Sequence, residues 1–231
     1  APASWHLWSP VTEKAEDIEA CRKMTFDAGE EPIGGTSWWL DPVCLGRYPD
    51  TTGYSYEAYL PDITAEDMKI ISQPIDFIGM NVYQTYRGKA GENGTCITIP
   101  NDPGYARTNA EWPVTPEALY WGPKFLYERY RKPIYITENG MACHDTVSQD
   151  GKVHDPNRID FLARYLKNLK RAAEEIDIRG YFQWSLMDNF EWDKGYAERF
   201  GIIYVDFETQ ERIWKDSAYW YRDLIRRNGD F

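Results

Sequence analysis

The chain has 231 residues, of which 42% are hydrophobic, so it can bury one sizeable core as one large domain or part of one. Its net charge of −11 argues against a nucleic-acid partner, because phosphate binding needs clustered Lys and Arg. It contains no apolar run of the roughly 20 residues that a membrane span requires, so we expect no membrane partner. The 10 Trp and 17 Tyr exceed what such a core needs. Aromatic rings stack on the apolar faces of sugars, which favours a carbohydrate ligand, although packing is the more common role of any single Trp.

The cysteines are widely spaced without a C-x-x-C pair, and the chain has three His. This pattern predicts neither a zinc site nor a dense disulfide framework, and we expect no metal and no cofactor. Free cysteines favour a reducing compartment, and so a cytoplasmic location. The chain begins Ala1-Pro2-Ala3-Ser4 without an initiator Met or a signal-peptide pattern, so this expectation leaves secretion open.

The sequence patterns of the first segments differ in how clearly they predict secondary structure. Residues 1–7 suggest a short strand that frays. Residues 12–28 carry small or apolar residues at helical spacing and acidic residues early, which predicts a helix capped by Thr12 and ended by Gly29. Residues 36–62 are rich in Trp, Tyr, Pro and Gly without a clean period, so we expect a long structured loop.

The next segments are easier to interpret. Residues 64–71 predict a short helix. Residues 76–83 (DFIGMNVY) are a nearly continuous apolar run, which is typical of a buried parallel strand. Residues 85–113 are polar and contain Gly and Pro, and so long an irregular segment in a compact domain is often a binding loop.

Helices and strands alternate along the second half of the chain. This alternation predicts an α/β fold with a parallel sheet. A complete doubly wound sheet would carry a Gly-rich phosphate loop after a strand, and because none is present we expect half of an eight-stranded barrel. The predicted elements are a helix over 115–130 with Thr115 as cap and Pro116 first, a strand over 134–137, a loop over 141–154, a helix starting at Asp155-Pro156, a strand over 180–186, an extended segment over 200–206 and a helix over 216–228 stopped by Gly229.

Glu138 stands at the carboxyl end of the strand over 134–137, directly before the turn residues Asn139-Gly140. Parallel α/β folds place catalytic groups at this edge, where a carboxylate can be a base, a nucleophile or a metal ligand. The next strand leads into residues 184–192, whose acids are interleaved with Trp and Phe. This composition fits a sugar pocket better than a metal site. The period of two in a strand sends Asn81 and Tyr83 to one side, toward Glu138.

Four segments carry a resemblance to a known family. They are DFIGMNVY (76–83), PIYITENG (133–140), GYFQWSLMDNFEW (180–192) and ERFGIIYVDF (198–207), with Trp112-Pro113 before the following helix. Together they resemble the C-terminal half of a glycoside hydrolase family 1 β-glucosidase. The resemblance implies that residues 1–231 are the C-terminal portion of a single (β/α)₈ TIM barrel domain, with about strands five to eight.

The resemblance also implies a retaining mechanism that uses two glutamates. Glu138 matches the nucleophile that forms the covalent glycosyl-enzyme. The family's acid/base is the Glu of an Asn-Glu-Pro motif, which this chain lacks. Its nearest imitation, Glu30-Glu31-Pro32, follows a helix and reads as loop. We therefore expect a chain that carries the nucleophile but not the acid/base and is inactive alone.

Other site residues follow from the same resemblance. Tyr83 matches a catalytic tyrosine that orients the nucleophile and favours its ionised form. From the residues alone, Phe200 and Trp184 could instead be packing residues, and Asn81 could cap its strand. The matched substrate-binding residues are Asn81 beside the nucleophile, Glu191 with Trp184 and Trp192 around the sugar hydroxyls, Trp112 on the leaving-group side and Phe200 near the pocket floor.

The expected function is hydrolysis of terminal non-reducing β-D-glucosyl residues from β-glucosides or cello-oligosaccharides, as in cellulose degradation. A carboxylate at Glu191 would repel a 6-phosphate, and Lys194 and Arg199 form no clear phosphate cradle. Three alternatives stay open: a non-catalytic carbohydrate-binding protein, a galactosidase or fucosidase specificity, and a myrosinase-like enzyme. Because half a barrel exposes open sheet edges, we expect the N-terminal half of the same barrel as a partner.

Overall fold

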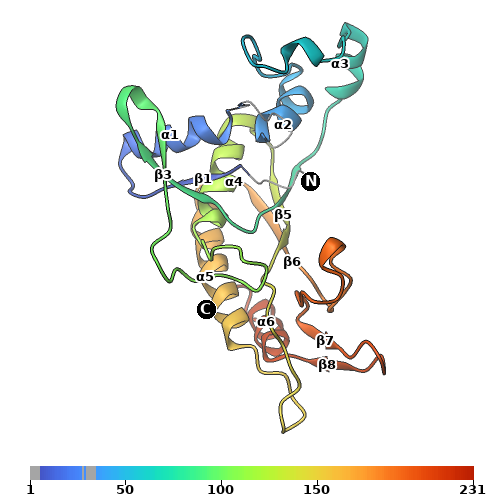
Figure 1. Cartoon of the computed structure of the whole chain (residues 1–231). Helices are drawn as coiled ribbons and strands as arrows, with labels where there is room; N and C mark the ends of the chain where they lie inside the picture. The colour runs from blue at the N-terminus through green and yellow to red at the C-terminus, as the bar shows by residue number, and fades with distance from the viewer. Residues whose placement is uncertain (1–5, 28, 30–34) are drawn as a thin grey trace.

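The computed structural model describes residues 6–27, 29 and 35–231. Its centre is a parallel sheet with the strand order β2-β5-β6 (Figure 1). The strands are β2 (Ile78–Asn81), β5 (Ile134–Asn139) and β6 (Ile178–Gln183). The parallel sheet confirms the expectation from the alternating pattern. β6 is shifted from the predicted 180–186, because the backbone after Gln183 leaves the ladder.

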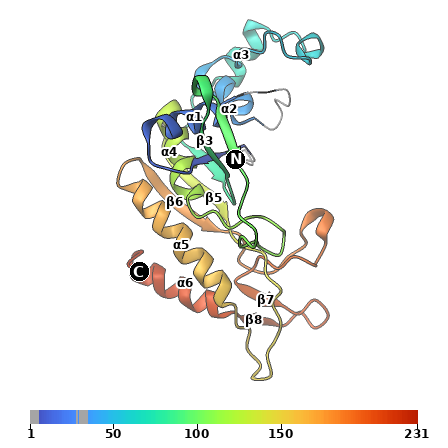
Figure 2. The same cartoon turned by 60° about the vertical axis from the view of Figure 1, so that its left-hand side comes forward.

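Helices α4 (Ala118–Tyr130) and α5 (Pro156–Ala173) cover one face of this sheet, and α6 (Asp216–Arg226) runs beside α5 (Figure 2). Proline at the first position of α5 fits the helix start, because its missing N–H would have no partner there. Burying this interface supplies most of the apolar core. The fully buried core side chains are Ile78, Met80, Ile134 and Ile136 from the strands and Leu119, Leu126 and Leu162 from the helices.

The opposite face of the sheet keeps large apolar side chains in solvent. Phe77 is 49% exposed and its ring lies 4.8 Å from that of Tyr135. Phe182 on β6 is 58% exposed. Because burying such side chains is worth about 1.5–3 kcal/mol each, this face would gain stability from a further layer of protein.

A second sheet has the order β1-β3-β4, with β1 parallel to β3 and β3 antiparallel to β4. Its presence corrects the expectation of an irregular loop over 85–113, and the first strand lies after the predicted 1–7, of which residues 1–5 are outside the described residues. The hairpin was hidden because its sequence is polar and contains Gly88. A Cβ at Gly88 would lie 2.7 Å from both Cys21 Sγ and Cys96 Sγ, so only glycine lets α1 pack here. The elements are β1 (Trp8–Pro10), β3 (Tyr86–Ala90), β4 (Cys96–Ile99), the turn η3 (Glu92–Gly94) and α1 (Ala15–Thr25).

The expected loop over 36–62 contains a helix, α2 (Thr36–Leu45), which is a correction. Gly46 ends it in the left-handed region at φ 70°, a conformation that glycine adopts without strain. Tertiary contacts decide this helix, because its buried Asp41 accepts hydrogen bonds from Arg129 and from the Tyr130 hydroxyl of α4. The single turn η2 (Glu57–Tyr59) and helix α3 (Ala65–Ile71) follow.

Neither threonine that was expected to cap a helix does so. Thr64 caps α3 with a reciprocal bond to Asp67, but α1 begins at Ala15 and Thr12 donates a hydrogen bond to the Asp17 side chain instead. Thr115 lies outside α4 and accepts a hydrogen bond from the Thr85 amide. Ala28, the predicted end of the first helix, is outside the described residues. A threonine near a helix start thus caps it only when no tertiary partner competes.

The last part of the chain adds the turn η4 (Trp192–Lys194) and the hairpin of β7 (Ile203–Val205) and β8 (Arg212–Trp214). This hairpin lies at the opposite end of the molecule from α2 and α3 (Figure 1). All four cysteines are free. Across the three described stretches, none of the helices combines the length and apolar character of a membrane span.

Candidate active site

The side chains of Tyr83, which follows β2, and Glu138, on β5, meet at the ends of these two strands. Asn81 pairs with Glu138 across the two strands, after a register shift between Met80 and Asn81. The Tyr83 hydroxyl donates a 2.8 Å hydrogen bond to Glu138 Oε2. Beside it, the Thr137 hydroxyl donates to Asn81 Oδ1 at 2.7 Å. The strand-end geometry inferred from the period of two is therefore present, with the irregular register deciding which residues face each other.

Tyr83 is held as a hydrogen-bond donor. Burial, and then the negative charge of Glu138, raises the pKa of the phenol far above its usual range of about 10. The hydroxyl therefore keeps its proton at any physiological pH and continues to direct it at the carboxylate. A fixed donor of this kind holds the Glu138 carboxylate in one orientation.

Asn139 and Gly140 do more than turn the chain. The Asn139 side chain donates to the Val82 carbonyl at 2.8 Å and accepts from the Tyr181 hydroxyl at 2.8 Å, so it joins all three strands behind Glu138. A Cβ at Gly140 would lie 1.8 Å from the Trp184 carbonyl oxygen. The sequence reasoning treated these residues only as turn chemistry, and their contribution to positioning became visible with the third strand.

Glu191 lies on the segment that follows β6. It accepts a 3.3 Å hydrogen bond from the Trp184 indole N–H. Burial raises the pKa of Glu191, the Trp184 bond opposes that shift, and the charges of Glu138 and Glu198 add to it. Glu191 therefore lies within electrostatic reach of two other carboxylates, those of Glu138 and Glu198.

Aromatic rings line the other side of the site. The Tyr83 and Trp112 ring centroids are 5.1 Å apart, and the Phe200 centroid lies 5.9 Å from that of Trp112 and 6.2 Å from that of Tyr83. Trp192 is 83% exposed, so its indole is available to a ligand rather than packed in a core. The mixture of mutually packed and exposed rings suits one fixed wall and one open stacking surface.

All eight residues singled out from the sequence line one cavity of about 570 Å³, which we name the strand-end pocket. Its size is that of a small-molecule site. Sequence reasoning missed other lining residues, among them Glu198, whose carboxylate accepts a 2.7 Å hydrogen bond from the Asn109 side chain. Only its position in the segment over 198–207 hinted at it. The residues that line the pocket are Asn81, Tyr83, Gln84, Ala110, Trp112, Glu138, Trp184, Glu191, Trp192, Asp193, Lys194, Glu198 and Phe200.

The charge of the strand-end pocket is strongly negative. Among the described residues, four carboxylates line it (Glu138, Glu191, Asp193 and Glu198) against one cation, that of Lys194. Within the described parts of the chain, no three His, Cys, Asp or Glu side chains are grouped so that they could hold a metal ion. The pocket can therefore accept hydrogen bonds from hydroxyl groups, stack on apolar ring faces and present a nucleophilic carboxylate.

Comparison with known proteins agrees with this geometry. The family model described as glycosyl hydrolase family 1 matches residues 3–230. The chain belongs to glycosyl hydrolase family 1. It is 42% identical over 224 residues to a 1,4-beta-D-glucan glucohydrolase of Thermotoga neapolitana, covering 96% of this chain and 49% of the relative. A bifunctional beta-D-glucosidase/beta-D-fucosidase of Bifidobacterium breve is 40% identical, with 90% and 50% covered.

Solved structures of this family show the same fold. The beta-glucosidase from Thermotoga maritima in complex with glucoimidazole matches with a TM-score of 0.80 at 40% identity, over 97% of this chain and 50% of that one. The chain thus spans about half the length of the curated relatives it matches, and its α/β architecture is part of a TIM barrel. The family and fold predictions are confirmed. The division into strands five to eight stays a prediction.

Proposed function

We propose that this chain supplies the nucleophile of a retaining β-glucosidase, with Glu138 in that role. The observation that carries the proposal is the 2.8 Å hydrogen bond from Tyr83 to Glu138 at a strand end, inside the strand-end pocket. Glu138 attacks the anomeric carbon and forms a covalent glycosyl-enzyme, and water then releases the sugar. Tyr83 holds the attacking oxygen in place before and after each step.

A second carboxyl must complete the mechanism. In retaining enzymes it lies about 5–5.5 Å from the nucleophile, protonates the leaving oxygen and later deprotonates water. The printed sequence has no Asn-Glu-Pro motif, and Glu30-Glu31-Pro32 is outside the described residues. We therefore propose that this acid/base comes from the other half of the barrel and that the chain alone turns over almost no substrate.

The same pocket supports a neutral sugar as substrate. Glu191 accepts hydrogen bonds from sugar hydroxyls, assisted by Asn81, while Trp184 and Trp192 cover the ring and Trp112 with Phe200 borders the leaving group. The surplus of carboxylates disfavours sugar phosphates. This fits terminal β-D-glucosyl groups of β-glucosides or cello-oligosaccharides. A β-fucosidase activity is the second candidate, because the Bifidobacterium breve relative is named for both activities.

We propose the other half of the barrel as the partner of this chain, because part of the chain's surface is apolar. An apolar cavity of about 400 Å³ lies between α6 and the segments after β6. Leu186 and Ile225 at this cavity are each 61% exposed, and Trp214 is 44% exposed. Apolar surface on this scale favours docking of further protein. Sedimentation of the chain as a well-folded 27.0 kDa monomer, unchanged by added partner, would contradict this proposal.

The function is tested by co-expressing this chain with the N-terminal half of the Thermotoga maritima β-glucosidase, a combination we name the reconstituted enzyme. We expect hydrolysis of 4-nitrophenyl β-D-glucoside by the reconstituted enzyme and almost none by either half. The β-D-fucoside is assayed beside it. Glucose binding without hydrolysis in the reconstituted enzyme would favour a carbohydrate-binding protein instead. Full-rate hydrolysis by this chain alone would show that it needs no partner.

A further inference from the structure

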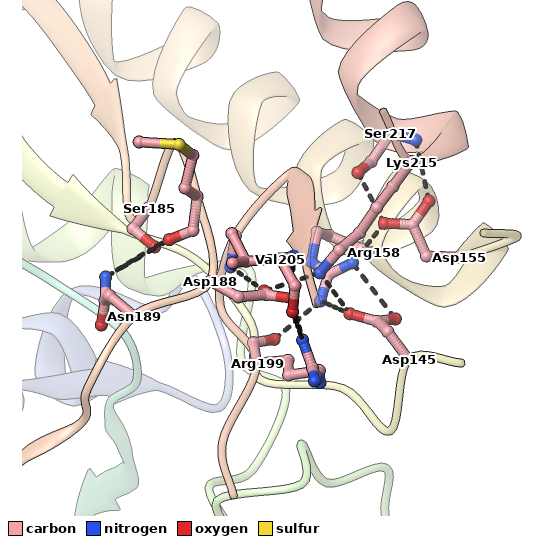
Figure 3. A network of polar contacts seen from close by, with 12 residues as sticks. Asp145, Asp155, Arg158, Ser185, Asp188, Asn189, Arg199, Val205, Lys215 and Ser217 are labelled. Atoms are coloured by element: carbon pink, nitrogen blue, oxygen red, sulfur yellow. Dashed lines mark hydrogen bonds and ion pairs between the residues drawn. The ribbon is translucent and has the colours of Figure 1, made fainter. Parts of the chain in front are cut away.

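The structure contains a second polar cluster, which we name the buried charge network: Asp145, Asp155, Arg158, Asp188, Arg199 and Lys215 (Figure 3). It contains three carboxylates and three cations, so its formal charges cancel. The side chains of Arg158, Asp155, Asp188 and Lys215 are completely buried. A buried network of this kind is stable only when each charge has a partner of opposite sign, because a buried charge without a partner costs much free energy.

Asp188 lies on one of the two segments that line the strand-end pocket and has hydrogen-bond partners on the other. It lies on the segment from Trp184 to Trp192, three residues before Glu191. Its carboxylate accepts from Lys215 Nζ at 2.8 Å, from Arg199 Nη1 at 2.6 Å and from the Gly201 amide at 3.0 Å. Gly201 directly follows Phe200 of the pocket. One carboxylate therefore ties the segment that carries Trp184 and Glu191 to the segment that carries Glu198 and Phe200.

The two segments also meet backbone to backbone. The Ser185 amide donates to the Phe200 carbonyl at 3.2 Å, and the Asp188 amide donates to the Ile203 carbonyl at 3.0 Å. A Cβ at Gly201 would lie 2.2 Å from the Asp188 nitrogen. The two segments are therefore packed without free space between them. A displacement of the Asp188 carboxylate must then move both segments.

Asp155 belongs to the same network but contacts the start of α6 instead of the segments that line the pocket. It accepts from the Ser217 amide at 2.8 Å and from the Ser217 hydroxyl at 2.6 Å, and it pairs with Arg158. These contacts join the start of α5 to the start of α6. Both Asp155 and Asp188 have fully buried side chains, so they are a matched pair that differs in what they hold.

We propose that Asp188 is a positioning residue of the strand-end pocket, which holds the Trp184–Glu191 side and the Glu198–Phe200 side of the pocket at a fixed separation through the buried charge network. Lys215 and Arg199 are its anchors. This inference rests on the proposed function only in what the pocket binds. The positioning itself is a property of this chain and can be measured without sugar.

The test compares Asp188→Asn with Asp155→Asn, since each replaces one fully buried carboxylate of the network with a neutral amide. In hydrogen exchange of this chain within the reconstituted enzyme, Asp188→Asn is expected to speed amide exchange over residues 185–203 several-fold. Asp155→Asn should instead affect the starts of α5 and α6. With D-glucose as probe and tryptophan fluorescence as readout, Asp188→Asn should weaken binding about tenfold more than Asp155→Asn.

Equal effects of the two variants on exchange over residues 185–203, or none from Asp188→Asn, would overturn the proposal. If the reconstituted enzyme with the unmodified chain does not bind glucose, the proposed function is weakened while the exchange data still decide the positioning claim. If Asp188→Asn does not fold, Arg199→Lys serves in its place, because it keeps the positive charge but cannot reproduce the guanidinium contacts. It should loosen the same residues to a smaller extent, and unchanged exchange there would again overturn the proposal.

Discussion

The strand-end pocket and the buried charge network both contain several carboxylates, and they differ in how those charges are matched. In the network, three carboxylates face three cations and nearly all are buried. In the pocket, as far as the described residues line it, four carboxylates face one cation, that of Lys194. Matched charges hold the structure together, whereas unmatched ones remain available to a ligand. The contrast separates carboxylates that stabilise the fold from those that can do chemistry.

The sharpest test of this contrast is Glu138→Gln, which keeps the shape and removes the negative charge. We expect the reconstituted enzyme to lose β-glucoside hydrolysis by several orders of magnitude, because the amide cannot form the glycosyl-enzyme. The free energy of unfolding should hardly fall, since an unneutralised charge is removed. Glu92→Gln, at an exposed turn, is the control and should leave the rate unchanged. Hydrolysis that survives Glu138→Gln would disprove the nucleophile assignment.

In contrast to Glu138→Gln, removing one charge from the buried charge network should strongly lower the free energy of unfolding. Arg158→Met leaves Asp145 and Asp155 with less compensation in a buried site, and breaking such a pairing costs about 3–5 kcal/mol of unfolding free energy. Urea denaturation of the reconstituted enzyme measures this loss. Lys69→Ala is the control, because Lys69 and Glu66 are each more than 70% exposed and such pairs contribute about 0–1 kcal/mol. Similar losses of unfolding free energy in both variants would mean that the buried charge network contributes no more to stability than an exposed ion pair.

Tyr83→Phe tests the one bond that fixes the proposed nucleophile. The ring still packs against Trp112, but the donor to Glu138 is gone. Because a hydrogen bond to a charged group contributes about 1.5–3 kcal/mol, we expect a loss of that size in transition-state stabilisation, measured as kcat/KM of the reconstituted enzyme. Tyr196→Phe, on an exposed ring outside the pocket, is the matched control. An unchanged kcat/KM would show that Tyr83 does not position Glu138.

The smallest effect is expected at the surface, where a charge pair depends on pH. His154 lies 2.6 Å from Asp216 and 3.1 Å from Asp150, and the hydrogen bond to Asp216, followed by that to Asp150, raises the pKa of His154. The folded-state pKa is thus above the unfolded value of about 6.5. The stabilisation is complete below that value and disappears as pH rises through the folded-state pKa.

Thermal unfolding between about pH 6 and about pH 9 measures this dependence. The melting temperature of the chain should fall slightly across this range, and the fall should be smaller in His154→Gln, which cannot become charged. The difference is small because all three side chains are at least 40% exposed and water screens their charges. An identical slope in both proteins would mean that the His154 pairs contribute nothing.

Much of the site could be predicted from the sequence because strands carry their geometry locally. The apolar runs over 76–83 and 133–137 indicate parallel strands, and the acid directly after the second run places Glu138 at the catalytic edge. Period-two geometry then directs Tyr83 toward it. Fold elements with non-local causes were missed: α2 depends on Asp41 meeting α4, and the β3–β4 hairpin depends on Gly88 making room for two cysteine side chains.

The sequence by itself thus determined the parallel α/β architecture through strand periodicity, and the family and eight residues of the strand-end pocket through short motifs that resemble that family. The tertiary structure alone decided which charges are matched. Asp188 and Glu191 lie three residues apart on one segment. Asp188 is matched by Lys215 and Arg199, while Glu191 has only an indole N–H among the hydrogen bonds found for its side chain. Pairing depends on which distant side chains the fold brings within about 3 Å, and no local pattern carries that information.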